Sequence, residues 1–330
     1  MRIVKPNHEI LLPENPLRHI EKIGRICYKS EDAITEISAE PFVGRLFKSS
    51  HHAMLEHFRF IVEIHKTDYF YLMSSEYNKY ITFTCENGRH IISASARGLN
   101  DMFVSIRSRS SGLADDVLAT NILADIAELI VNHYNCRVIF SGEILSTFPP
   151  SEDDGIMRII DNFDELSNYE YEMHAWYSIL FTCDRGVTHE MVRHRDASFA
   201  QESTRYCNYS KGKYGSEITV IDPFFFDENE ERKYINGCDW AVNKHDVWKV
   251  CMQNLEKAYM MLTELGAVPQ QARTILPSST KADIVITAQV YEWRHIFDLR
   301  VLGKTGTPHP QIKEVMEPAY NEMLANRYLR

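Results

Sequence analysis

Residues 80–94 read YITFTCENGRHIISA, and this stretch gives the most direct indication of the fold. Two runs rich in β-branched and aromatic residues, 80–85 and 90–94, lie on either side of Asn87 and Gly88. An Asn-Gly pair between two such runs is a strong signal for a tight β-hairpin. The stretch therefore predicts two antiparallel strands joined by a short turn.

Further strands are expected on both sides of this hairpin. Residues 58–71 (FRFIVEIHKTDYFY) begin with period-2 alternation, and residues 176–182 (WYSILFT) have a similar strand composition. Residues 281–287 (KADIVIT) fit either a strand or the start of a helix. Residues 18–30 indicate a helix that leads into a strand-like segment, ICYKS.

Helices alternate irregularly with these strands. Apolar residues repeat every four positions from Leu118 to Ile130, and Val247, Cys251, Leu255, Ala258 and Leu262 share one helical face. Residues 290–299 and a last segment containing Pro318, a residue expected to kink its helix, are also predicted to be helical. The irregular order favours an α+β fold, a mixed sheet with flanking helices, over a doubly wound sheet.

The composition restricts the class of protein. The chain has 330 residues, of which 44% are hydrophobic, so a sizeable core is expected. Forty-six acidic residues against 36 basic ones give a net charge of −10, which disfavours a general nucleic-acid binder. Seven cysteines without a CxxC pair predict reduced thiols. With no signal-like segment and no long apolar run, we expect a cytoplasmic protein without a membrane partner.

The densest chemical signal is RHRDASFAQESTRY, residues 193–206. Arginine forks beside hydroxyl and amide side chains are suited to phosphate and carboxylate recognition. Any one of these arginines could instead stabilise the negative end of a helix dipole at a helix C-terminus, and this alternative stays open for each of the three. Ser203 lacks the G-x-S-x-G context of a serine nucleophile, so we favour a phosphate-binding role for it.

Arg193-His194-Arg195, followed after seven residues by Ser203, resembles the signature of the flavin-dependent thymidylate synthases. Three further blocks resemble segments of that family in the same order: 51–57 (HHAMLEH), 266–277 (GAVPQQARTILP) and 289–300 (QVYEWRHIFDLR). The resemblance implies one synthase domain over residues 1–330, assembled as a homotetramer with sites between subunits. The acidic segments near 149–172 and 227–245 are expected to be solvated insertions in that domain.

The resemblance also implies an activity, the reductive methylation of dUMP to dTMP. Methylenetetrahydrofolate would donate the carbon, and FAD reduced by NADPH would supply the hydride. No metal is implied. The FAD contacts would be His51, Ala53, Arg193, His194, Arg195, Gln201, Gln289, Tyr291 and His295. The dUMP contacts would be Glu190, Arg193, Gln201, Glu202, Ser203, Thr204, Arg205, Arg273 and Arg300.

Arg300 matches the arginine that favours the N3-ionised pyrimidine, so it is the catalytic candidate. If residues 289–300 form one helix, Gln289 and Arg300 are about three turns apart and share a face. His295 lies off that face. Instead of contacting FAD, it could be a buried histidine whose hydrogen bonds are made within the protein. The residues Ala53, Ala200, Gln201 and Gln289 differ from those usual in the family, so other hydrogen-bond partners are expected there.

Three other interpretations remain. A nucleic-acid module could use the basic cluster with Phe199, Tyr206 and Tyr209, although the net charge disfavours it. A metal-dependent hydrolase could use the histidines of residues 51–57, but HHAMLEH does not match HExxH. The third is an inactive homologue or a nucleotide-binding flavoprotein.

Overall fold

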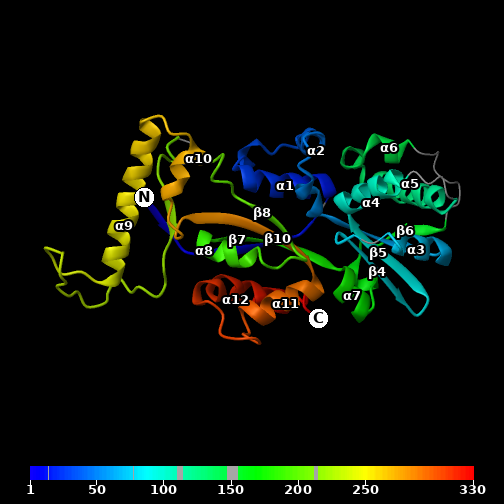
Figure 1. Cartoon of the computed structure of the whole chain (residues 1–330). Coiled ribbons are helices and arrows are strands. Elements are labelled where there is room, and N and C mark those ends of the chain that lie inside the picture. Colours follow the sequence, from blue (N-terminus) through cyan, green and yellow to red (C-terminus); the bar gives the residue numbers. More distant parts are fainter. Residues whose placement is uncertain (14, 77, 110–113, 147–154, 212–214) are drawn as a thin grey trace.

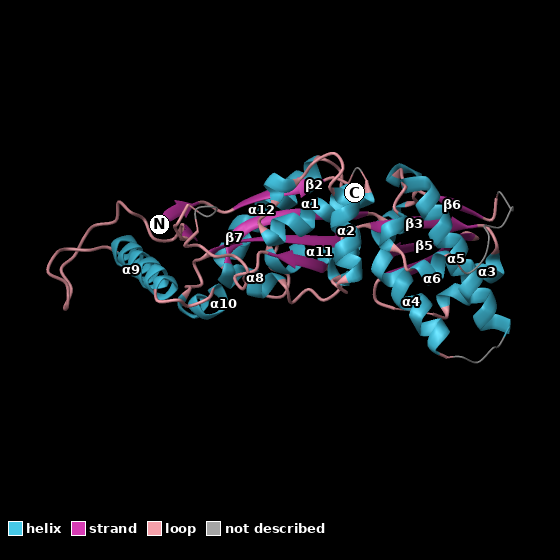
Figure 2. Cartoon of the chain, turned by 90° about the horizontal axis from the view of Figure 1, so that it is seen from above, coloured by secondary structure: helices cyan, strands magenta, loops and turns pink. Residues whose placement is uncertain are grey.

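The computed structural model describes residues 1–13, 15–76, 78–109, 114–146, 155–211 and 215–330. The described part forms an elongated molecule with helix α9 at one end and helices α3–α6 at the other (Figures 1 and 2). Its α-helices are α1 Pro16–Tyr28, α2 Ala39–Lys48, α3 Thr67–Ser74, α4 Ala96–Ser108, α5 Ala114–Tyr134, α6 Gly142–Leu145, α7 Asn168–His174, α8 Arg185–Met191, α9 Lys244–Glu264, α10 Pro269–Ala272, α11 Val290–Arg300 and α12 Pro310–Ala325.

Two four-stranded antiparallel sheets form the body of the molecule. The first sheet has the order β2-β7-β10-β8, and the second has the order β4-β5-β3-β6. A short parallel pair, β1 with β9, is separate from both. The α+β class is thus confirmed, but with several sheets. The strands are β1 Arg2–Val4, β2 Asn7–Leu11, β3 Arg59–Ile64, β4 Ile81–Glu86, β5 Arg89–Ser95, β6 Met157–Ile159, β7 Trp176–Asp184, β8 Ser198–Gln201, β9 Thr219–Ile221 and β10 Lys281–Gln289.

The predicted hairpin is strands β4 and β5, in which Glu86 pairs with Arg89 across the turn. Asn87 and Gly88 have φ angles of 52° and 79°, the left-handed region that a two-residue turn of this kind requires. The strand predicted from residue 58 is also confirmed as β3, but it ends at Ile64. Residues 67–74 are helical because Phe70 and Met73, three positions apart, both face the core.

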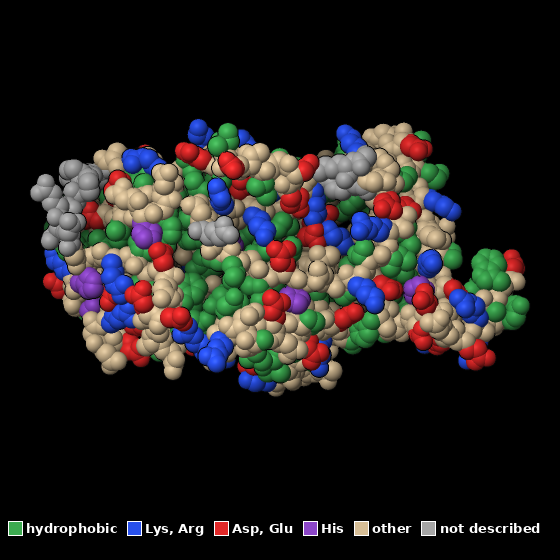
Figure 3. All heavy atoms as spheres, turned by 180° about the vertical axis from the view of Figure 1, so that it is seen from behind, with side chains coloured by type: hydrophobic (Ala, Val, Ile, Leu, Met, Phe, Trp, Pro, Cys, Tyr) green, Lys and Arg blue, Asp and Glu red, His purple; other side chains and the backbone are tan. Residues whose placement is uncertain are grey.

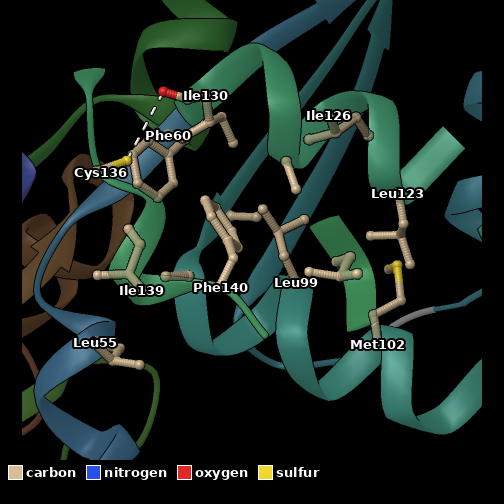
Figure 4. Close-up of a cluster of buried hydrophobic side chains, with 14 of the residues drawn as sticks. Leu55, Phe60, Leu99, Met102, Leu123, Ile126, Ile130, Cys136, Ile139 and Phe140 are labelled. Carbon is tan, nitrogen blue, oxygen red and sulfur yellow. Dashed lines mark hydrogen bonds between the residues drawn. The ribbon is translucent and has the colours of Figure 1, made fainter. Parts of the chain in front are cut away.

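The second sheet is covered by α4 and α5 (Figure 1). The four-residue repeat of α5 is confirmed from Ile122 through Ile126 to Ile130, which are buried, but its first member, Leu118, is exposed. Figure 4 shows Ile126 and Ile130 of α5 and Leu99 of α4 in one cluster with Phe60 of β3. The Cys136 thiol is buried there and donates to the Ile130 carbonyl, with 3.8 Å between sulfur and oxygen. This region is an apolar core, with interlocking aliphatic and aromatic side chains.

The first sheet is covered on both faces. Helix α1 packs on one face against Ala200 and Val285, whereas α8, α11 and α12 pack on the other. The strand-like segment predicted after residue 25 is wrong, since α1 continues to Tyr28 and ends at Lys29, whose φ is 50°. Residues 26–28 (ICY) are apolar because they lie on a buried part of this helix. Residues 281–287 belong to a strand, β10, in the middle of the sheet.

The two acidic segments differ in structure. Residues 155–172 contribute to the fold: β6 pairs with β3, and Tyr171 of α7 is buried. The acidic residue Glu170 of α7 is also buried, because Arg89 pairs with it at 2.7 Å. Residues 149–154 lie outside the described residues. Residues 224–240, by contrast, form a largely exposed loop.

No helix in the described ranges is long and apolar enough to cross a membrane.

Candidate active site

A pocket opens at the edge of the first sheet, between the end of α1, the 3-10 helix His52–Glu56 and strand β8. Its volume of about 480 Å³ lies within the usual range for small-molecule sites. Its walls hold both aromatic and polar side chains, a combination suited to a planar ligand with hydrogen-bonding groups. The lining residues are Cys27, Tyr28, Ser50, His51, His52, Ala53, Met54, Arg97, Phe199, Ala200, Gln201, Ser203 and Tyr206.

Four of the expected FAD and dUMP contacts line this pocket: His51, Ala53, Gln201 and Ser203. They come from two segments that are distant in the chain, and tertiary packing brings them together. His51 Nδ1 lies 3.2 Å from the Tyr28 hydroxyl, which fixes the plane of the imidazole. The histidines of the HHAMLEH segment face different partners, since His52 contacts the Phe47 carbonyl instead.

A buried hydrogen-bonded chain holds the His52–Glu56 wall in place. His57 Nδ1 lies 2.7 Å from Thr287 Oγ1, Thr287 bonds to Ser178 at 2.7 Å, and Ser178 bonds to His19 at 3.0 Å. Burial lowers the pKa of His57 to about 4 and that of His19 to about 3. Both imidazoles are therefore neutral at pH 7, and the chain anchors the wall to strands β7 and β10 without a buried charge.

The Ser203 turn is fixed by backbone hydrogen bonds. The Ser203 N–H donates to the Cys27 carbonyl at the end of α1, at 3.3 Å, and the Cys207 N–H donates to the Ser203 carbonyl at 3.0 Å. The Arg205 N–H donates to Ser203 Oγ at 3.3 Å. The turn therefore presents a hydroxyl and a backbone segment to the pocket, with the Arg205 side chain exposed beside it.

Glu202 points away from this pocket, into a network of buried charges. Its carboxylate pairs with Lys281 at 2.9 Å and accepts from the Tyr209 hydroxyl at 3.3 Å. Asp283 pairs with Lys281 at 2.6 Å and also with Lys29. Burial alone would raise the pKa of the Asp283 carboxyl, but Lys281 and Lys29 lower it overall. Glu202 thus anchors the turn from behind.

A second group of candidate residues lies between α8 and α11. Arg300 Nη1 donates to Glu190 Oε2 at 3.0 Å, and Nη2 donates to the Glu190 carbonyl at 3.2 Å. Arg300 Nε donates to His194 Nε2 at 3.1 Å, so His194 carries its proton on Nδ1, which faces Glu292 at 3.6 Å. The His295 ring meets the His194 ring edge-on, with 5.8 Å between centroids. The guanidinium is held in one orientation by Glu190 of α8 and by His194 in the turn that follows that helix.

Gln201 connects the two groups. It lines the pocket, and its Nε2 donates to Thr188 Oγ1 of α8 at 2.8 Å, two residues before Glu190. Arg193 and Arg195, which follow α8, are exposed. The Nη1 atom of Arg185, at the start of α8, is buried without a partner among the described residues. Residues 184–196 thus hold three arginines and three carboxylates, so the α8 region offers guanidinium groups without a net positive charge.

Other candidate residues lie elsewhere. Gln289 is the last residue of β10, and its buried amide donates to Thr82 Oγ1 at 3.0 Å and Ser93 Oγ at 3.3 Å in the second sheet. The expected helix face shared by Gln289 and Arg300 is therefore wrong, because α11 begins only at Val290. Thr204 is buried, and Arg273 is exposed on the 3-10 helix Arg273–Ile275. Tyr291 is half-buried at the start of α11.

Several residues of the pocket wall were not among the expected FAD and dUMP contacts. Tyr28 and Tyr206 meet edge-on, with 6.4 Å between ring centroids. Arg97 pairs with Glu56, whose other carboxylate oxygen accepts from Ser198 Oγ at 2.8 Å. Tyr206 ends the arginine-rich stretch and was expected only as a base-stacking residue, whereas nothing local to Arg97 or Tyr28 distinguishes them from other surface residues.

The sequence pattern of the family described as thymidylate synthase complementing protein matches residues 151–325, just over half of the chain. The flavin-dependent thymidylate synthase of Pyrococcus abyssi is 29% identical over 148 residues, which is 45% of this chain and 54% of that protein. The enzyme of the same name from Pyrococcus furiosus is 30% identical over 143 residues, 43% and 51% of the two chains. The chain thus spans about half the length of the curated relatives it matches.

Among solved structures, the chain aligns with that of PolB, a UMP/dUMP methylase from Streptomyces cacaoi bound with 5-Br dUMP. The alignment covers 98% of this chain and 93% of that one, with 14% identity and a TM-score of 0.38.

Proposed function

The chain belongs to the thymidylate synthase complementing protein family, and from this premise we propose that it methylates dUMP to dTMP. Methylenetetrahydrofolate would donate the carbon and NADPH the reducing equivalents, with FAD as the bound cofactor. The observation that carries the proposal is the pocket in which the His51 segment meets the Ser203 turn. Two of the four sequence blocks of the family resemblance meet there.

The pocket residues suit a flavin. Tyr28, Phe199 and Tyr206 offer aromatic surface for a planar ring, while His51 and Gln201 offer hydrogen-bonding groups. When bound, FAD supplies the hydride that reduces the transferred carbon. The exposed Arg193 and Arg195 provide the charge that a pyrophosphate needs. The proposed FAD contacts are His51, Ala53, Arg193, His194, Arg195, Gln201, Gln289, Tyr291 and His295.

The Ser203 turn would hold the nucleotide phosphate. Ser203 Oγ accepts from the Arg205 N–H, which leaves its own proton to donate to a phosphate oxygen. The Arg205 guanidinium adds a charge-assisted donor from the same turn. The proposed dUMP contacts are Glu190, Arg193, Gln201, Glu202, Ser203, Thr204, Arg205, Arg273 and Arg300, with Glu202 acting through its anchoring of the turn.

Arg300 would stabilise the ionised pyrimidine. A guanidinium held by Glu190 and His194 needs no reorganisation to face negative charge developing at N3. His194 accepts from Arg300 and is neutral, so it orients the guanidinium without competing for a negative ligand. Glu190 offsets part of the Arg300 charge, so the carboxylate sets how strongly N3 ionisation is favoured.

The proposed site residues are divided within one chain. The pocket, the Arg300 group, Gln289 and Arg273 lie on different elements, and Arg273 is exposed after α10. We therefore propose that complete sites form between copies of the chain, in a homotetramer. This arrangement lets one copy supply the pocket wall while another supplies an arginine.

The direct experiment mixes the purified protein with FAD, NADPH, methylenetetrahydrofolate and dUMP and measures dTMP by mass spectrometry. The expected result is dTMP formation, with flavin absorbance that bleaches when NADPH is added. Flavin and dUMP binding without dTMP would instead identify a nucleotide-binding flavoprotein. A protein that stays colourless after incubation with FAD would contradict the proposal.

A further inference from the structure

The end of the molecule formed by α9 exposes an unusual amount of apolar surface. Of the 22 large hydrophobic side chains exposed in the described part of the chain, ten fall between residues 224 and 268. Met261 and Leu265 are 60% and 84% exposed. Concentrated apolar exposure of this kind marks an interaction surface, because a monomer gains nothing from it.

The side of α9 that faces the body is the one carrying Trp248, Met252 and Tyr259. The helical face expected from the sequence, Val247, Cys251, Leu255, Ala258 and Leu262, is not the core face, because Val247 and Cys251 are exposed and the other three are half-buried. The outer side of α9 has its own regular pattern: Val247, Cys251, Asn254, Ala258, Met261 and Leu265, named here the α9 seam. All members of the seam are exposed except Ala258, which is half-buried.

The α9 seam has the spacing of a coiled-coil contact. Its members follow one another at intervals of four, three, four, three and four residues, and all are uncharged. This 3.5-residue repeat keeps a continuous stripe in contact with a second helix. An ordinary one-sided surface helix needs only the buried stripe that α9 already has.

Two copies of the seam fit each other when the helices run antiparallel. The twofold axis then crosses the helices at the level of residue 256, midway along the seam. Val247 then faces Leu265 of the partner subunit, and Cys251 faces Met261 of the partner subunit. Asn254 faces the small Ala258 of the partner subunit next to the axis, so the helices can approach closely. Each layer joins a larger side chain to a smaller one, which is the packing that interlocking side chains require.

Charge also favours the antiparallel direction. Lys244, Lys249 and Lys257 are exposed along the first two-thirds of α9, and Glu264 is exposed near its end. The helix dipole adds positive charge at the N-terminus and negative charge at the C-terminus. Antiparallel helices place these opposite ends together, whereas parallel helices place like ends together.

The loop before α9 would extend the contact. It exposes Phe224, Phe225 and Trp240, and its base is fixed to α9 because Asn243 Nδ2 donates to the carbonyls of Glu228 and Glu230, each at 3.0 Å. Figure 1 shows this loop projecting beyond the body beside α9, and Figure 3 shows hydrophobic side chains gathered at its tip. A two-helix seam alone would bury little area for a stable dimer, and the loop adds to it.

We propose that the α9 seam pairs antiparallel with the same seam of a second copy of this chain. The inference concerns a surface separate from the pocket, and it stands whether or not the chain methylates dUMP.

Disulfide trapping tests the register. Met261→Cys should form crosslinked dimers with two disulfides each, and peptide mass spectrometry should show that both join the introduced thiol to the native Cys251 of the other copy. The same two positions within one helix are ten residues apart, about 15 Å, and cannot join. Val104→Cys on α4, which is 63% exposed, is the matched control and should give no more dimer than the wild type. Cys251→Ser in the Met261→Cys background should abolish the crosslink.

Light scattering tests the assembly itself. Leu265→Glu places two charges in the seam and should halve the mass of the native particle, while Val104→Glu should leave it unchanged. Melting curves check that both variants remain folded. A Met261→Cys variant that crosslinks no better than Val104→Cys, a wild-type disulfide between the two copies of Cys251, or an unchanged Leu265→Glu mass would each overturn the proposal.

Discussion

The two sheets of this molecule both pack large apolar cores, but they differ in where their buried polar side chains lie. Around β4-β5-β3-β6, α4 and α5 supply aliphatic and aromatic side chains, and the buried His174 bonds to Thr84 and Ser93. Around β2-β7-β10-β8, the face toward α8, α11 and α12 is a second large apolar cluster. The face toward α1 instead carries the buried His19 and His57 and the ion pairs of Lys29, Lys281, Glu202 and Asp283. Buried polar groups contribute little stability but fix geometry when they are paired. Both sheets therefore supply stability, whereas the α1 face of the first sheet also positions the site.

The largest expected effect on stability is in the apolar core of the second sheet. Ile126→Ala removes a buried side chain from the α5 core and should lower the free energy of unfolding by about 2–5 kcal/mol, measured by urea denaturation. Leu118→Ala, near the exposed start of the same helix, is the matched control and should cost far less. Turnover per folded molecule should not change in either variant. Equal losses of unfolding free energy in the two variants would contradict the role given to the α5 core.

The largest effect on chemistry should come from Arg300. Arg300→Ala removes the fixed cation and should reduce dTMP formation roughly 10²–10³-fold, with NADPH oxidation by the flavin retained. Arg300→Lys should recover little, because lysine cannot make the forked contacts with Glu190 and His194. Rapid-mixing absorbance separates the two half-reactions. Near-normal dTMP formation by Arg300→Ala would reduce this residue to a structural role.

A smaller effect is expected at the Ser203 turn. Ser203→Ala removes one neutral donor to a charged phosphate, worth about 1.5–3 kcal/mol, so the KM for dUMP should rise more than kcat falls. Ser210→Ala, farther along the same loop, serves as the control. Steady-state kinetics gives both constants. A covalent adduct between Ser203 and the nucleotide in mass spectrometry would instead establish a nucleophile.

The mildest test is the pH dependence of stability. The pKa of His57 is lowered to about 4 and that of His19 to about 3, so the unfolded chain takes up protons at these sites near pH 6.5 while the folded chain does not. Stability is therefore full above pH 6.5 and falls as the pH drops toward 4. His57→Gln should flatten this slope in urea titrations between these pH values. An unchanged slope would place the titrating groups elsewhere.

The sequence predicted features that depend on neighbouring residues. The Asn87-Gly88 hairpin and the α5 repeat follow from backbone preference and local periodicity, and both are present in the structure. The arginine-rich stretch 193–206 was recognisable because a basic cluster stands out in an acidic chain. These signals require no knowledge of what the segment packs against.

Tertiary structure alone decided the rest. Residues 155–172 looked like a solvated insertion because they are acidic, yet Arg89 neutralises Glu170 and β6 completes a sheet. Gln289 and Arg300 looked like one helix face, yet Gln289 ends a strand and bonds to the other sheet. The physical reason is that these ion pairs, buried hydrogen bonds and strand pairings depend on residues distant in the chain, 81 positions away for Arg89 and Glu170 and 207 for Thr82 and Gln289. Composition and periodicity carry no record of those partners.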